Sequence, residues 1–145
     1  MSRILRLSLA FAVVILLAAC GSTSATPSTP QSFAVTAKEF GFTPAQLTVT
    51  AGQPVELTFQ NTGAVEHDWS VREIDLAGSP SATGETGDAH MSGMHDAPKL
   101  HVAAGPAGQS KLTFTPSKAG TYEVFCTVAG HKEAGMVGTL TVKAQ

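Results

Sequence analysis

The chain has 145 residues, of which 43% are hydrophobic and 14% charged, with a formal net charge of −2 at pH 7. This length suits one domain. The low charge excludes the basic surface expected of a protein whose main function is nucleic-acid binding. The sequence contains no P-loop, no dinucleotide fingerprint and no nucleophile elbow built on serine. Composition and motifs therefore argue against nucleic-acid, nucleotide and serine-hydrolase functions.

The first twenty residues predict an export signal. Arg3 and Arg6 precede an apolar run from Leu7 to Ala19, which is too short for a permanent membrane span. The run ends in small residues before Cys20 and resembles a bacterial lipobox, in which this cysteine carries a diacylglycerol. We expect a lipoprotein signal peptide over 1–19 and lipidation of Cys20, with an ordinary secretory signal as the alternative.

A polar tether is expected next, over residues 20–32, because small polar residues and two prolines cannot bury apolar surface. Residues 33–145 form the expected folded domain. The predicted location is extracytoplasmic and membrane-anchored, in the periplasm or on the cell surface. Lipidation of Cys20 leaves Cys126 without a disulfide partner, and an exported lone thiol is a liability unless something occupies it.

The residue pattern changes at Phe33: short runs of alternating polarity, rich in β-branched residues, are separated by Gly, Pro and Asn. This pattern predicts an all-β fold, a Greek-key β-sandwich or barrel of about eight strands. The expected strands are Phe33–Phe40, Gln46–Thr50, Val55–Asn61, Trp69–Ile74, Leu100–Ala103, Lys111–Thr115, Gly120–Cys126 and Val137–Lys143.

A long insert over residues 77–98 departs from this rhythm and is expected to be a structureless loop. It contains four soft or borderline ligands, which make it a hypothetical accessory copper site for Cu(I). A flexible polar insert with chance Met and His residues is the alternative. The four residues are His90, Met91, Met94 and His95, and His101 follows in or at the start of a strand.

Four residues form the predicted metal site. One strand delivers Cys126 to its end, His131 and Met136 follow at intervals of five, and His67 lies upstream after a turn-like segment at 61–63. A thiolate, two imidazoles and a thioether are the ligand set of a blue-copper electron-transfer site. Taken singly, each residue is more simply a core or loop residue. Zinc is the chemical competitor, but structural zinc rarely accepts methionine.

The Cys-x4-His-x4-Met loop, with the upstream histidine, resembles the cupredoxin family over residues 33–145. It matches auracyanin-like proteins more closely than azurins, which have one residue fewer between His and Met. The resemblance implies a cupredoxin fold and a single type 1 copper held by His67, Cys126, His131 and axial Met136. It also implies that the ring edge of His131 reaches the surface within a small apolar patch.

The residue after the first histidine departs from the azurin-like pattern, because Asp68 stands where Asn is usual. An ionised Asp68 near the metal is expected to stabilise Cu(II) and lower the reduction potential, and a hydrogen bond from Thr127 to offset this. Trp69 and Phe125 adjoin ligands in the sequence. We expect them to pack in the core under the metal rather than to carry electrons.

The predicted function is a membrane-tethered, one-electron carrier cycling between Cu(I) and Cu(II), with copper as its cofactor. It is not expected to be an enzyme by itself, because copper enzymes of this fold need further copper centres. It is also expected to be a monomer. The expected partners are redox proteins of respiration or photosynthesis and the membrane, with no nucleic acid. A copper chaperone or buffer is the alternative, and an exported zinc or purely structural module is the third.

Overall fold

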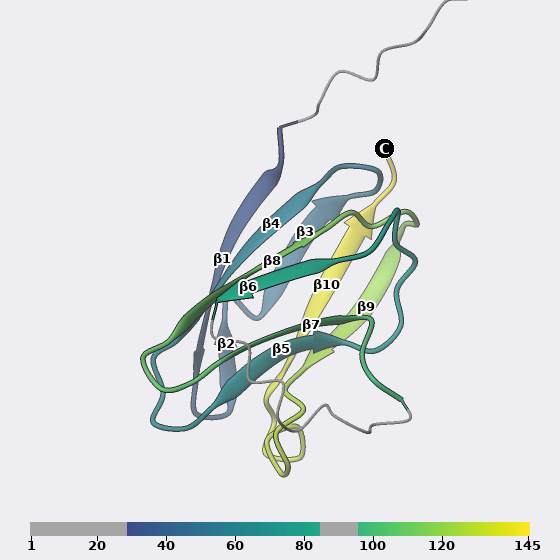
Figure 1. The fold of residues 1–145 in the computed structure, drawn as a ribbon. Coiled ribbons are helices and arrows are strands. Elements are labelled where there is room, and N and C mark those ends of the chain that lie inside the picture. The colour runs from purple at the N-terminus through teal and green to yellow at the C-terminus, as the bar shows by residue number, and fades with distance from the viewer. Residues whose placement is uncertain (1–28, 85–95) are drawn as a thin grey trace, which may run out of the picture.

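The computed structural model describes residues 29–84 and 96–145. The expected signal peptide, Cys20 and the four residues of the predicted accessory copper site lie outside the described residues. Within the described ranges no helix has the length and apolar character needed to cross a membrane. The described chain forms ten strands (Figure 1): β1 Gln31–Lys38, β2 Gly41–Thr43, β3 Gln46–Thr50, β4 Val55–Asn61, β5 His67–Val71, β6 Ser81–Gly84, β7 Leu100–Ala104, β8 Gln109–Phe114, β9 Gly120–Phe125 and β10 Val137–Lys143.

The strands form two five-stranded sheets. The first has the order β2-β1-β4-β8-β6, and the second has the order β3-β10-β9-β5-β7. The pairs β1–β4 and β3–β10 are parallel, whereas the other pairs are antiparallel. The prediction of an all-β sandwich is therefore confirmed. β9, β5 and β7, which carry or support the predicted metal site, are neighbours in the second sheet.

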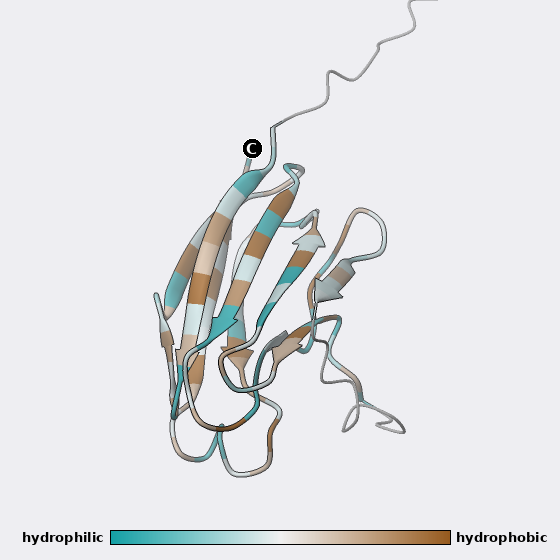
Figure 2. Ribbon diagram, turned by 60° about the vertical axis from the view of Figure 1, so that its left-hand side comes forward, coloured by the Kyte–Doolittle hydropathy of each residue, from teal (hydrophilic) through white to brown (hydrophobic). Residues whose placement is uncertain are grey.

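The core lies between the sheets and follows the period-two alternation of the strands. In β4, Val55, Leu57 and Phe59 are buried, while the residues between them are more exposed. Figure 2 shows the same alternation as bands of hydrophobic and hydrophilic colour along the strands. Trp69 is 2% exposed and belongs to this core, as expected, with its ring centroid 6.4 Å from that of Phe114. Burial of each large apolar side chain stabilises the folded state by about 1.5–3 kcal/mol relative to leaving that side chain in water.

Two strands are additional to the eight expected. β2 has only three residues and pairs antiparallel with β1. β6 lies inside the insert that was expected to lack structure and pairs with β8. Its residues Ser, Ala, Thr and Gly are all exposed, so no burial pattern marks them as a strand.

Strand boundaries also differ from expectation, most of all in β1 and β5, while the limits of β7, β8 and β9 differ by one or two residues. β1 begins at Gln31, whose backbone N–H donates to the Pro54 carbonyl at 2.8 Å, and it ends at Lys38 rather than Phe40. Phe40 has a φ of 62° and is 50% exposed, which places it in a turn. β5 begins two residues before the expected strand, at His67, and ends three residues earlier than expected, at Val71 rather than Ile74. All five residues of β5 are buried, which removes the alternation that would have fixed its limits.

Candidate metal centre

A single loop carries three of the four predicted ligands. Cys126 directly follows β9, and Met136 directly precedes β10. Backbone bonds fold the loop back on itself: the N–H of Cys126 donates to the Met136 carbonyl at 3.3 Å, and that of Met136 to the His131 carbonyl at 3.0 Å. Gly130 and Gly135 have φ values of 83° and 99°, which other residues rarely adopt. The backbone itself therefore brings the three residues to one end of the sandwich.

The fourth predicted ligand, His67, opens β5 after a turn that Asn61 organises. The buried Asn61 amide donates to the carbonyls of Val65 at 2.7 Å and Ala104 at 2.9 Å, and its oxygen accepts from the Gly63 N–H at 2.8 Å. A Cβ added to Gly63 would lie 2.9 Å from His67 Nε2. The turn is thus packed directly against the ring of His67, which fixes its position.

The structure brings three of the predicted ligands together. The ligand atoms of His67, Cys126 and His131 all lie within 4.8 Å of one another. Their residues are 0%, 1% and 9% exposed, and the centroids of the two imidazole rings are 4.9 Å apart. Met136 is fully buried in the same apolar cluster as Cys126. Its role as axial ligand stays a prediction.

The chemistry of His67 fits a metal ligand. Within the described residues, neither ring nitrogen has a hydrogen-bond partner, although both are buried. Buried polar atoms without partners are rare and call for an explanation such as an ion. Burial, followed by the neighbouring His131, lowers the pKa of His67 and so favours the neutral ring. A neutral imidazole offers a lone pair to a metal ion, as binding requires.

The Cys126 thiol is held tightly in its protonated form. Burial, followed by the charge of Asp68, raises the pKa of the Cys126 thiol to about 12. Sγ accepts from the Asp68 backbone N–H at 3.5 Å and lies 3.5 Å from His131 Nδ1. Because a metal binds the thiolate, loading displaces this proton, and the affinity for metal falls as the pH falls.

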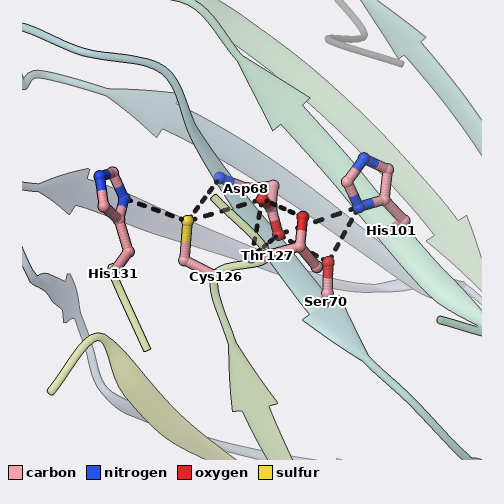
Figure 3. A network of polar contacts seen from close by, with 6 residues as sticks. All are labelled: Asp68, Ser70, His101, Cys126, Thr127 and His131. Carbon is pink, nitrogen blue, oxygen red and sulfur yellow. Dashed lines mark hydrogen bonds and ion pairs between the residues drawn. The ribbon is translucent and has the colours of Figure 1, made fainter. Parts of the chain in front are cut away.

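Asp68 ties the two ligand-bearing segments together (Figure 3). Its fully buried carboxylate accepts hydrogen bonds from the Thr127 N–H at 2.9 and 3.0 Å and from the Thr127 hydroxyl at 2.8 Å. Oδ2 also accepts from the Cys126 thiol at 3.5 Å. The hydrogen bond predicted from Thr127 is therefore present twice, through its backbone and through its side chain. The Asp68 carboxylate therefore lies directly against the sulfur, and its effect on the reduction potential stays a prediction.

Several contacts near the site were not predicted from the sequence. Phe40, which was expected at a strand end, packs edge-on against His131 with ring centroids 5.4 Å apart. Ser70 and His101 extend the Asp68 network away from the metal site. Phe125 is buried as expected, but the charged groups of Arg72 and Lys132 lie over its ring. The Phe40–His131, Ser70–His101 and Arg72–Phe125 contacts join segments far apart in the chain, so local sequence spacing does not predict them.

Two β-sheets with a thiol and two imidazoles buried at one end define a cupredoxin-type copper domain. A family model described as copper-binding proteins of the plastocyanin/azurin family matches residues 31–143, and the chain belongs to this family. Copper is thus the cofactor, and the nitrogen and sulfur donors found here suit it.

Curated relatives and solved structures agree with this assignment. The chain is 36% identical over 103 residues to the copper-resistant cuproprotein CopI of Rubrivivax gelatinosus, covering 70% of this chain and 59% of that protein. It is 31% identical to auracyanin-A of Chloroflexus aurantiacus, covering 89% and 90%. The solved structure of auracyanin A, titled a "blue" copper protein, is 27% identical with a TM-score of 0.55, covering 79% and 100%. Auracyanin from Roseiflexus castenholzii, at 22% identity and a TM-score of 0.58, covers 80% and 99% and shows the fold.

Proposed function

We propose that the protein is a one-electron carrier held at the outer side of a membrane by a lipid on Cys20. The observation that carries the proposal is the buried, preformed cluster of His67, Cys126 and His131. We assign these residues, with Met136, as the copper ligands. Copper bound there supplies a one-electron change between Cu(II) and Cu(I).

The chain itself keeps the ligands in place during such a change. The loop is fixed by its own backbone bonds, His67 by the turn at Asn61, and Cys126 by the Asp68 network. A scaffold that holds ligands in one arrangement requires little reorganisation, which favours fast electron transfer. We infer a carrier rather than an enzyme, because 31–143 is one cupredoxin domain with one proposed copper site.

The first test is the absorption spectrum of the copper-loaded protein. A Cu(II)–thiolate bond gives intense visible charge-transfer absorption, and reduction should bleach it reversibly at one copper per chain. Loading with Zn(II) is the control, because zinc has no redox chemistry and should leave the protein colourless. A colourless copper-loaded protein contradicts the proposal and favours a zinc or structural role.

We propose that electrons leave through the edge of the His131 ring. His131 is 9% exposed while Cys126 is 1% exposed, so the histidine is the more accessible of the two. Small residues flank it on the loop. Lys132 and Glu133 follow it in the sequence and Glu66 precedes His67, and we assign these three charges to the rim. Phe40 and Val65, which are 50% and 46% exposed, add apolar surface. An apolar centre with a charged rim suits brief docking of a redox protein. The small residues are Val128, Ala129, Gly130, Ala134 and Gly135.

A bulky charge in this patch is therefore expected to slow electron exchange. Ala129→Glu and Ala134→Glu should each lower the rate of exchange with a partner and of self-exchange by about tenfold or more, because docking must then desolvate a charge. The absorption spectrum should not change, since neither residue is a proposed ligand. Stopped-flow kinetics measures the rates.

The matched control is Ala144→Glu. Ala144 is exposed beside the C-terminus, at the end of the sandwich opposite the 126–136 loop (Figure 1). It should exchange electrons at the wild-type rate. Wild-type rates in both loop variants would mean that this face is not the port.

The proposed membrane anchor is compatible with this geometry. β1 begins at the end of the sandwich opposite the 126–136 loop, as Figure 1 shows. A tether entering β1 would therefore leave the His131 face directed away from the membrane. This orientation supports a carrier that meets partners in the surrounding compartment.

Cys20→Ala is expected to prevent lipid addition and signal cleavage at the lipobox, because alanine has no thiol to acylate. Mass spectrometry of the mature protein checks the modification. A shortened chain starting at Thr29, which retains all of β1, should be soluble and keep the copper spectrum. A mature wild-type protein without acylation at residue 20 contradicts the anchor.

Copper handling is the second candidate function, favoured by the likeness to CopI, which is described as copper-resistant. In this alternative the same four ligands serve a chaperone or buffer. The two functions differ in how copper is held. A carrier retains one copper in both redox states, whereas a chaperone releases Cu(I) readily to a chelator.

A further inference from the structure

A chain of polar contacts runs from the predicted metal site across β5 to the neighbouring strand β7, where it ends at His101 (Figure 3). Ser70 Oγ donates to Asp68 Oδ1 at 2.7 Å, and Ser70 Oγ lies 2.9 Å from His101 Nδ1. His101 Nδ1 is itself 3.9 Å from Asp68 Oδ1. The other carboxylate oxygen, Oδ2, lies 3.5 Å from Cys126 Sγ. A single carboxylate thus faces both the sulfur and the histidine.

Strand pairing builds this chain. Ser70 on β5 stands opposite His101 on β7, and Asp68 stands opposite Ala103 in the same register. Residues two apart on a strand share a face, so Asp68 and Ser70 point to the same side of the sheet. The His101 side chain is 12% exposed, whereas Asp68 is fully buried, so His101 is the outermost group of this chain of contacts.

The hydrogen-bond directions fix where His101 holds its proton. A carboxylate only accepts, so the single hydroxyl proton of Ser70 is directed to Asp68. Ser70 Oγ must then accept from His101, which places a proton on Nδ1 of the neutral ring. The second protonation site of the ring is then Nε2, which is buried, so its protonation requires a small local opening of the structure. The imidazolium that results lies close to the Asp68 carboxylate without breaking any bond of the chain.

We propose that His101 tunes the reduction potential of the copper centre through Ser70 and Asp68, so that proton uptake at His101 accompanies electron uptake at the metal. With His101 neutral, the charge of Asp68 beside Cys126 stabilises Cu(II) and lowers the potential. With His101 protonated, its positive charge offsets that of Asp68, and the potential rises. By linkage, the reduced protein binds the His101 proton more tightly. This proposal rests on the proposed copper site.

Few other charges face His101 from the elements packed against it. On β5 the ionisable groups are Asp68 and the proposed ligand His67, and beyond the strand Arg72 is paired with Asp96 at 2.7 Å. β6 has no ionisable side chain. On β8 and β4, Lys111 and Glu56 pair with each other at 3.0 Å on the outer face of the other sheet. Among these described groups, Asp68 is the charge that lies against His101, with its Oδ1 3.9 Å from Nδ1.

The first experiment measures the reduction potential of the full copper-loaded protein against pH. Histidine changes charge between about pH 5 and 8. The reduction potential of the wild-type protein should therefore fall as the pH is raised through this range. We expect the affinity for the electron to change about tenfold, equivalent to about 59 mV for a one-electron couple. His101→Gln, which does not titrate, and Ser70→Ala, which breaks the chain, should both flatten the profile. Ser117→Ala, at an exposed serine, is the matched control and should keep it.

The second experiment needs no metal. In the metal-free protein, NMR follows the ring signals of His101 as the pH changes. Asp68→Asn removes the charge 3.9 Å from Nδ1, so the titration midpoint of His101 should move to lower pH. An unchanged midpoint would show that Asp68 and His101 are not coupled.

The outcomes separate this inference from the function on which it rests. A colourless copper-loaded protein contradicts the copper site itself. A blue protein whose potential is independent of pH, or whose pH profile survives unchanged in His101→Gln, overturns the tuning role alone. The visible spectrum of each variant shows whether its copper site is intact.

Discussion

Replacing Cys126 by serine is expected to abolish the intense visible absorption of the copper-loaded protein. Cys126 is 1% exposed, and its Sγ lies within 4.8 Å of the ligand atoms of both His67 and His131. An alcohol has no comparable charge-transfer bond to Cu(II) and is much harder to deprotonate than a thiol. We expect the absorption to fall by at least about a hundredfold and copper affinity by about as much.

Serine is close to cysteine in size, so the fold should survive this change. Circular dichroism of the metal-free variant checks it. Thr139→Ser is a matched control, since it leaves a partly buried hydroxyl on β10 and lies outside the ligand loop. The control should keep full colour. Equal colour in Cys126→Ser would remove Cys126 from the ligand set and contradict the proposed centre.

The second large effect is expected at Met136, where two substitutions should shift the reduction potential in opposite directions. Met136→Gln offers a harder oxygen donor, which favours Cu(II) and lowers the potential. Met136→Leu removes the donor and should raise it. We expect each shift to exceed about 59 mV, a tenfold change in affinity for one electron. Voltammetry of the copper-loaded variants provides the measurement.

Met136→Leu also tests folding separately from ligation. Met136 is fully buried in the apolar cluster, and exchange of Met for Leu in a core costs less than about 1.5 kcal/mol. The variant should therefore unfold near the wild-type temperature in the metal-free state. A potential unchanged in both variants would mean that Met136 packs beside the metal without binding it.

The sequence predicted the proposed ligands because three of them are close together on one loop. Cys126, His131 and Met136 follow one another at fixed intervals after a recognisable strand. His67 was found through its chemistry and its position after a turn. The Asp68 interaction with Thr127 was also anticipated, because each of these residues is next to a ligand in the sequence.

The remaining contacts of the site depend on pairings that local patterns do not contain. Ser70 meets His101 because β5 and β7 pair in one register out of several. Phe40 meets His131 because the chain turns at a residue that looked like the end of a strand. β6 was missed because its side chains are small and wholly exposed, and its strand conformation comes from pairing with β8.

The single paired position between β5 and β9 has a mechanical consequence. These strands carry His67 and lead to Cys126, yet they pair only at Ser70 and Phe125. Copper bound by both His67 and Cys126 would act as a removable cross-link between two strands that share only one paired position. In the chain-entropy view of a disulfide, closing a loop of roughly 60 residues restricts the unfolded chain by about 4 kcal/mol. Copper held by these residues would therefore make the native fold more resistant to unfolding as well as supplying the proposed redox change.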